Sequence, residues 1–189
     1  MNNTQPVLNY YNLSDDVKAF STTRHGGVSE GNYASLNINE YCGDSKDNTD
    51  ANRLLLANEL GIDANHIIMP HQTHGVESRI IGEEFATLPD GVKKMLLEGV
   101  DAVMTNIPGM CIGVSTADCI PVLLYDEEHH AAAAIHAGWR GTQARIVHKA
   151  VQEMRMAYQT DPTKLKAVIG PGISLDNFEV GDEVYADFE

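Results

Sequence analysis

The sequence predicts an α+β fold, in which a mixed β-sheet or sandwich carries helices on its outer faces. Two observations support this fold class. Short apolar runs of strand length recur along the chain, and segments with helical spacing are few. The connections between them are irregular, unlike a regular strand–helix repeat. A length of 189 residues is typical of one domain, so we expect residues 1–189 to form a single unit.

The first half of the chain combines short strands, one long loop and one helix. In chain order, the expected elements are strands at 6–11 and 17–23, a loop at 24–39, a helix at 47–60, strands at 67–69 and 76–81, a partly helical segment at 88–97, and strands at 101–105 and 111–115. The helix at 47–60 has a polar start, where Asn48 or Thr49 serves as its cap, and Gly61 ends it.

The last third of the chain gives the clearest pattern. Apolar runs at 120–125 and 131–135 are joined by a polar connection, which predicts a hairpin of two strands. Residues 143–158 follow as one helix, because their apolar positions repeat every three to four residues. Residues 166–169 read as a final strand.

Composition excludes several classes of protein. Lysine and arginine number 13 against 27 aspartates and glutamates, a net charge of −14, so a nucleic-acid partner is not expected. The longest apolar runs are too short to span a bilayer, and the start has no secretory pattern, so we expect a cytoplasmic protein without a membrane partner. The three cysteines form no disulfide framework and are expected to be free thiols.

Cys119 and His136 are the first candidate functional residues. Cys119 opens one strand of the predicted hairpin and His136 closes the other, so both should lie at the same end. A thiol and an imidazole in that position suit a nucleophilic pair or two ligands of a zinc ion. A buried apolar cysteine beside a capping histidine fits the spacing equally well.

Two further histidines extend this set. His71 and His74 lie three residues apart, and Gly75 follows them. One of the two, together with Cys119 and His136, would complete three protein ligands and leave an open coordination position, as in catalytic zinc sites. The other is expected at the surface or beside a ligand. His129 and His130, in the polar connection of the hairpin, read as exposed.

Glycine-rich turns beside arginines are candidate phosphate sites. Arg140 and Gly141 follow the second hairpin strand at an expected helix start, where backbone N–H groups favour anions. Arg24 stands beside another glycine pair. Tight turns that need glycine explain both segments as well. Asp118, next to Cys119, is the candidate acid that orients a ligand or transfers a proton, with an ordinary turn carboxylate as the alternative.

Six motifs in order give the chain a resemblance to a known family. They are Thr22-Thr-Arg-His-Gly-Gly-Val-Ser29, Ser35-Leu-Asn37, Asn52-Arg53, Gln72-Thr-His-Gly75, Ala117-Asp-Cys-Ile-Pro-Val-Leu-Leu124 and His136-Ala-Gly-Trp-Arg-Gly-Thr142. From about residue 17 to its end, the chain resembles the YfiH/YlmD family, known as the laccase-domain or multicopper polyphenol oxidase family and, more recently, as purine nucleoside phosphorylases.

The resemblance implies a zinc ion bound by His74, Cys119 and His136, which selects His74 over His71. It implies phosphorolysis of adenosine, inosine or methylthioadenosine, with adenosine deamination as a second activity. The substrates would be a purine nucleoside and phosphate. The implied fold is a mixed β-sandwich flanked by helices, which has been compared with the catalytic domains of cytotoxic necrotizing factor toxins.

Length is where the chain departs from this family. Family members usually continue for some tens of residues beyond the segment around Glu183, so we expect part of the C-terminal sheet or pocket to be missing. An incomplete sheet edge would favour a homo-oligomer.

Three alternatives from other classes stay open. Thiolate and imidazole ligands suit copper as well as zinc, which would fit a laccase-like polyphenol oxidoreductase, although the chain has no His-x-His motif. A metal-free hydrolase could use Cys119 as its nucleophile and His136 as its base. The third alternative is a module that binds nucleosides without turnover.

In the phosphorolysis scheme, Arg24, Arg140 and the amide region near Gly141 would hold phosphate, and His71 would contact a ligand or carry a proton.

Overall fold

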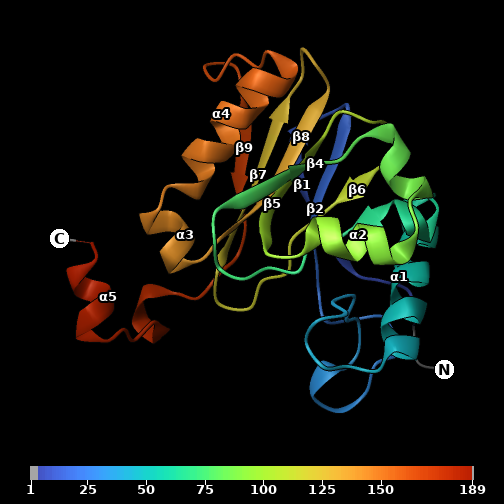
Figure 1. Ribbon diagram of the computed structural model, residues 1–189. Helices are drawn as coiled ribbons and strands as arrows, with labels where there is room; N and C mark the ends of the chain where they lie inside the picture. The colour runs from blue at the N-terminus through green and yellow to red at the C-terminus, as the bar shows by residue number, and fades with distance from the viewer. Residues whose placement is uncertain (1–3, 189) are drawn as a thin grey trace.

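The computed structural model describes residues 4–188, so residues 1–3 and 189 of the expected single domain lie outside it. Its centre is a five-stranded sheet in the order β4-β5-β8-β7-β9 (Figure 1). The strands of this sheet are β4 Glu77–Ile80, β5 Val100–Thr105, β7 Ile120–Asp126, β8 Ala131–Ala137 and β9 Lys166–Ile169. Strands β4 and β5 are parallel and the other neighbours are antiparallel. The mixed sheet of the predicted α+β class is therefore confirmed.

Each face of the central sheet is covered by a different layer. Successive side chains of a strand point to opposite faces. Accordingly, Met104 and Ile135 pack against helix α4 (Ile146–Tyr158), whereas Val103 and Ala134 pack against the other layer. That layer contains η3 (Glu83–Thr87), α2 (Asp90–Leu97), β3 (Ile67–Ile68) and β6 (Cys111–Ile112). The alanine-rich sequence of β8 gives both layers a flat surface to pack on.

The helix predicted at 143–158 starts three residues later in the structure, and a separate short helix precedes it. Helix α3 (Trp139–Gln143) starts directly after β8, and α4 starts at Ile146. Arg145 between them has a φ of 61°, a left-handed conformation that no continuous right-handed helix contains. Apolar spacing predicts the buried face of α4 correctly, but it does not register this break.

The N-terminal part forms a smaller layer around α1 (Lys46–Leu60). It includes the hairpin of β1 (Leu8–Ser14) and β2 (Val17–Thr22), and the short helices η1 (Gly31–Tyr33) and η2 (Ala64–His66). The helix begins after Ser45, so Asn48 and Thr49 lie inside it and the predicted cap is wrong. Gly61 ends it in the left-handed conformation, as predicted.

One buried side chain of α1 fixes the long loop before it. Asn52 is fully buried, and its amide oxygen accepts a hydrogen bond from the backbone N–H of Val28 at 2.8 Å. Its amide nitrogen donates to the Asn37 carbonyl at 2.8 Å and to the Ser29 hydroxyl at 2.9 Å. The predicted loop is therefore ordered by a polar side chain that the sequence placed within a helix.

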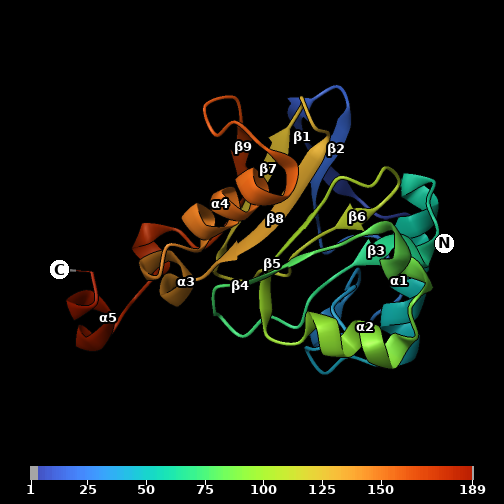
Figure 2. The same ribbon diagram turned by 45° about the horizontal axis from the view of Figure 1, so that its top comes forward.

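The C-terminal segment follows β9, the edge strand of the central sheet. It contains η4 (Leu175–Asn177) and α5 (Asp182–Ala186), and α5 stands apart from the main body in both ribbon views (Figure 2). Leu175 and Tyr185 are 91% and 65% exposed. Among the described residues, the structure contains no helix with the length and apolar character needed to cross a membrane.

Candidate metal centre

Strand register brings two of the predicted site residues to one face of the central sheet. In the β5–β8 pairing, Ala102 lies opposite Ile135, which sets Asp101 opposite His136. In the β7–β8 pairing, Pro121 lies opposite His136, and Cys119 precedes β7 by one residue. Because side chains alternate along strands, Asp101, Cys119 and His136 share the face opposite α4.

The third residue, His74, comes from the loop between β3 and β4. The ligand atoms of His74, Cys119 and His136 all lie within 4.8 Å of one another. The two imidazole rings meet edge to face, with their centroids 4.9 Å apart. His74 has a φ of 63°, a left-handed conformation that is uncommon for residues other than glycine and asparagine. Neighbouring contacts must therefore stabilise this backbone conformation.

Asp101 supplies those contacts, and it is the site residue that the sequence analysis missed. Its carboxylate is fully buried and accepts backbone N–H bonds from Thr73, His74 and Gly75 at 3.2, 3.0 and 2.8 Å. It also lies 2.7 Å from Nδ1 of His136. One side chain thus fixes both histidines. The available signal was the one charged residue of a fully buried strand.

The Asp101 contact also decides which nitrogen of His136 is available. With Nδ1 engaged by the carboxylate, Nε2 is the nitrogen that can bind a ligand or a metal. Carboxylates that hydrogen-bond metal-binding histidines in this way fix the orientation of the ring and raise its basicity as a ligand. The orienting role that we predicted for Asp118 is filled here by Asp101.

Electrostatics differ between the two acidic groups of the site. Burial raises the pKa of Asp101, but hydrogen bonds from His136, Gly75 and Thr73 outweigh it, so the pKa lies below its usual value. Burial raises the pKa of the Cys119 thiol, and the carboxylates of Asp118 and Asp101 raise it further. A thiolate at this position therefore needs a nearby cation, as metal coordination would provide.

Gly138 closes the site from one side. A Cβ at this position would lie 3.1 Å from Cδ2 of His74 and 3.2 Å from Sγ of Cys119, closer than side chains normally pack. Its φ of −70° is ordinary for any residue. The glycine is therefore required for space around the ligands, not for backbone conformation.

Gly141 and Arg140, two of the residues predicted to bind phosphate, both lie in the first turn of α3. Gly141 is buried inside α3, where an added Cβ would lie 3.1 Å from the Gly75 carbonyl. Its amide lies in the first turn of α3, which starts two residues earlier, so the predicted helix start near Gly141 is present in the structure. Arg140 is exposed and its guanidinium lies 4.2 Å over the Trp139 ring.

The remaining predicted residues lie at the surface or face other partners. Asp118 is exposed, and its backbone carbonyl accepts a bond from Ile173. Arg24 is exposed, and its guanidinium donates two hydrogen bonds to the Ala34 carbonyl, at 2.9 and 2.7 Å. His71 contacts Glu98 and Tyr41 and is not part of the group of three ligand residues.

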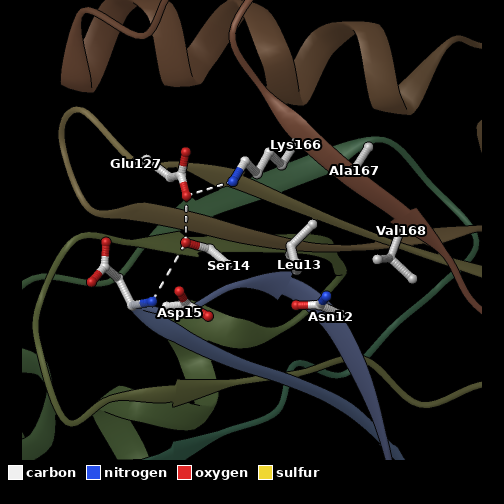
Figure 3. Close-up of a pocket in the computed structure, with 9 residues that line it drawn as sticks. Asn12, Leu13, Ser14, Asp15, Glu127, Lys166, Ala167 and Val168 are labelled. Carbon is white, nitrogen blue, oxygen red and sulfur yellow. Dashed lines mark hydrogen bonds and ion pairs between the residues drawn. The ribbon is translucent and has the colours of Figure 1, made fainter.

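A large hollow lies at the opposite end of the β7–β8 hairpin, away from this chemistry. It has a volume of about 790 Å³ and lies between β1, the turn after β7 and β9. Figure 3 shows the carboxylate of Glu127 bridging Ser14 and Lys166 across it. The seven residues of β7 separate it from Cys119, about 23 Å at 3.3 Å per residue. Its lining contains no cysteine or histidine.

The donor set defines the class of site. Two imidazoles and one thiolate are ligands that suit zinc, and three protein ligands leave a fourth position for water or substrate. The group fits such an ion because the orienting carboxylate and the space beside Gly138 are already built. The molecule is thus a mixed α+β fold in which three side chains that could hold a metal ion lie together at one end of the central sheet.

Comparison with known proteins places the chain in a family. The model of the multi-copper polyphenol oxidoreductase laccase family matches residues 18–189, and the chain belongs to that family. YlmD from Geobacillus stearothermophilus superposes with a TM-score of 0.81 at 29% identity, over 90% of this chain and 63% of that one. The YfiH/YlmD resemblance predicted from the sequence is confirmed.

Two curated relatives carry enzyme names. A purine nucleoside phosphorylase of Bacteroides thetaiotaomicron is 44% identical over 185 residues, covering 97% of this chain and 68% of the relative. Adenosine deaminase RL5, from an unknown prokaryotic organism, is 41% identical over 183 residues, covering 96% and 69%. The chain spans about two thirds of the length of these relatives and slightly less of YlmD.

Proposed function

We propose that this protein is a zinc-dependent purine nucleoside phosphorylase that also deaminates adenosine. The observation that carries the proposal is the His74, Cys119 and His136 group, held by Asp101 in a chain whose relatives are named for these two activities. The proposed substrates are a purine nucleoside, such as adenosine, inosine or methylthioadenosine, and inorganic phosphate.

The roles of the residues follow from their positions. His74, Cys119 and His136 hold the metal, which when bound would act as a Lewis acid and make water a better nucleophile. Asp101 keeps both histidines in place, as its four contacts require. Asp118 is exposed next to Cys119, where it can pass protons between solvent and substrate.

Phosphate binding is assigned to the arginines. The exposed guanidinium of Arg140 follows His136 by four residues, and Arg24 presents a second guanidinium from the ordered loop. Planar guanidinium groups bind phosphate oxygens in a bidentate manner. With a net charge of −14, the chain needs such local positive charge to attract an anion.

The test measures both activities in one protein preparation. Adenosine, inosine and methylthioadenosine are each incubated with phosphate, and free base is quantified by chromatography, while inosine formed from adenosine without phosphate reports deamination. We expect phosphate-dependent base release by the wild type, and loss of bound zinc and of all turnover in Cys119→Ala. Full activity of a zinc-free Cys119→Ala protein would exclude the proposal, and binding without turnover would favour a nucleoside-binding module.

A copper-dependent polyphenol oxidoreductase is the second candidate, favoured by the description of the family. The N,N,S ligand set also suits copper. Protein purified without added metal and analysed for zinc and copper distinguishes the two. Stoichiometric copper together with oxidation of phenols would replace zinc phosphorolysis as the function.

A metal-free hydrolase is the third candidate, favoured by the closeness of Cys119 and His136. Stoichiometric alkylation of Cys119 with loss of hydrolysis, in protein shown to contain no metal, would support it. Alkylation that occurs only after chelation would support the metal centre instead, because a coordinated thiolate is protected from the reagent.

A further inference from the structure

A second histidine–carboxylate pair lies beside the proposed metal centre. Nδ1 of His71 is 2.8 and 2.9 Å from the two carboxylate oxygens of Glu98. The ring of Tyr41 stacks on the imidazole, with centroids 4.4 Å apart and an interplanar angle of 22°. The side chains of His71 and Glu98 are 37% and 61% exposed, so the pair is open to solvent. These contacts fix the ring and leave Nε2 as the nitrogen without a described partner.

The backbone connects this pair directly to the centre. The N–H of His71 donates to the Leu97 carbonyl, and the N–H of Gly99 donates to the His71 carbonyl, both at 3.0 Å. His71 and Glu98 are therefore bridged like neighbouring parallel strands. Three residues further along both segments stand His74 and Asp101, which are hydrogen-bonded to each other. Three residues span at most about 10 Å, a separation that a purine nucleoside can bridge.

We propose that His71 is the residue that donates a proton to the departing purine. This inference rests on the proposed phosphorylase function. In the step, a phosphate oxygen forms a bond to C1′ of the pentose while the bond from C1′ to the purine nitrogen breaks. The electron pair of that bond moves into the purine ring, and the proton on Nε2 of the His71 imidazolium passes to a ring nitrogen of the purine. Neutral His71 then takes a proton from solvent.

Glu98 and Tyr41 are positioning residues in this step. Because the Glu98 carboxylate occupies Nδ1, only the Nε2 proton of the imidazolium can be transferred. Tyr41 stacks on one face of the ring in the orientation in which Nδ1 meets Glu98. Burial and the nearby Glu40 and Glu98 carboxylates raise the pKa of Tyr41 to about 12, although the charge of Arg53 opposes them. The phenol therefore stays neutral and does not exchange protons with His71.

The experiment compares two substrates that differ in their need for a proton. Inosine loses a purine that must be protonated, whereas 7-methylinosine already carries a positive charge on its ring and loses a neutral base. We expect His71→Gln to reduce phosphorolysis of inosine about 100-fold or more, as removal of a general acid does. Turnover of 7-methylinosine should change less than about threefold if the acid is not used. Glu98→Gln should show the same pattern with a smaller loss.

The matched control is His129→Gln. His129 also contacts a carboxylate, Asp126 at 2.9 Å, but in the turn at the far end of the hairpin. It should keep wild-type turnover of both substrates. Zinc content and circular dichroism are measured for every variant, so that a loss of metal or fold is recognised; Glu98→Gln is the second test if His71→Gln is poorly folded.

The outcomes separate the two proposals. An equal loss on both substrates, with zinc retained, would overturn proton donation and assign the pair a structural role. Wild-type activity of His71→Gln on inosine would overturn it as well, and so would a wild-type protein that cleaves inosine but not 7-methylinosine. In each of these cases the phosphorylase function stands. A wild-type protein that releases no base from inosine, 7-methylinosine, adenosine or methylthioadenosine in the presence of phosphate would instead refute the proposed function, and the role of His71 with it.

Discussion

The two ends of the β7–β8 hairpin carry similar side chains but differ in what surrounds them. At one end, the buried carboxylate of Asp101 contacts Nδ1 of His136 at 2.7 Å. At the other, the buried carboxylate of Asp126 contacts Nδ1 of His129 at 2.9 Å. Both carboxylates also accept backbone N–H bonds. The His136 side chain is 4% exposed, whereas the His129 side chain is 33% exposed.

The two histidine–carboxylate pairs differ in how far apart their residues lie in the sequence. Asp126 and His129 are three residues apart and close a turn, a local arrangement that side chains of aspartate commonly stabilise. Asp101 and His136 are 35 residues apart, and a third segment brings His74 to them. Among residues 4–188, this end holds the one group of three ligand side chains. A histidine–carboxylate pair is therefore not a site by itself; convergence of separate segments makes it one.

Removing a ligand should give the largest effect and act at one end alone. His74→Asn removes an imidazole but keeps a residue that tolerates a φ of 63°. We expect less than a tenth of the wild-type zinc content, while the metal-free variant unfolds within about 0.5 kcal/mol of metal-free wild type. His74→Val should lose zinc equally and also cost about 1–2 kcal/mol, because a β-branched residue is strained there. Metal analysis and urea unfolding measure both; stoichiometric zinc in His74→Asn would remove this residue from the ligand set.

Changing the two carboxylates in parallel sharpens the comparison. Asp101→Asn should weaken zinc binding about 10–100-fold, because both histidines lose their orienting group. Asp126→Asn should leave zinc binding unchanged. Each variant should lower the free energy of unfolding of the metal-free protein by about 1–3 kcal/mol, since an amide NH₂ then faces a buried backbone N–H. Zinc titration with a competing chelator checks the first effect, and equal affinities in the two variants would contradict it.

Low pH should reduce the loss of unfolding free energy that Asp101→Asn and Asp126→Asn cause. Burial raises the pKa of Asp126, but the neighbouring Thr160 hydroxyl and the hydrogen bonds from His129 and the Glu128 backbone outweigh it and leave the pKa below its ordinary value, as at Asp101. A carboxylate with a lowered folded pKa stabilises the protein above its unfolded pKa, and this contribution is lost as pH falls through the folded pKa. The difference in unfolding free energy between each variant and wild type should thus be full at pH 7 and shrink below pH ~4. A constant difference down to pH ~2 would contradict this account.

Crowding the metal centre should give an intermediate effect. Gly138→Ala places a Cβ at 3.1–3.2 Å from His74 and Cys119, so the ligands must shift apart. We expect zinc affinity to fall about tenfold, which corresponds to ~1.4 kcal/mol. Gly91→Ala is the matched control, because nothing lies within 4 Å of its added Cβ. Chelator competition on both variants tests the idea, and an unchanged affinity in Gly138→Ala would show that the site has more room than its contacts indicate.

The smallest effect is expected at the hollow of Figure 3. Lys166 lies 2.5 Å from Glu127, but both side chains are more than two fifths exposed, and ion pairs in water contribute little. Lys166→Met should leave zinc content, turnover and the urea midpoint unchanged within error. A loss of nucleoside turnover in this variant would indicate that the substrate binds at the hollow and not at the end that holds Cys119 and His136, which would contradict the comparison above.

Much of the fold follows from local patterns. Three features were predictable from neighbouring residues alone. They are the hairpin of β7 and β8, the buried face of α4 and the end of α1 at Gly61. The break at Arg145 was not predictable, because a left-handed conformation is uncommon for arginine and nothing in the neighbouring residues signals it.

For the candidate site, the sequence by itself indicated the candidate residues. Cys119 and His136 follow from a hairpin whose two ends can be counted, and family motifs single out His74. Only the tertiary structure showed that Asp101 joins them. Its four hydrogen bonds come from a loop and a strand that are distant in sequence, and no local pattern records which segments will meet. Strand alternation tells which face a side chain takes, whereas the pairing of β5 with β8 decides what it faces.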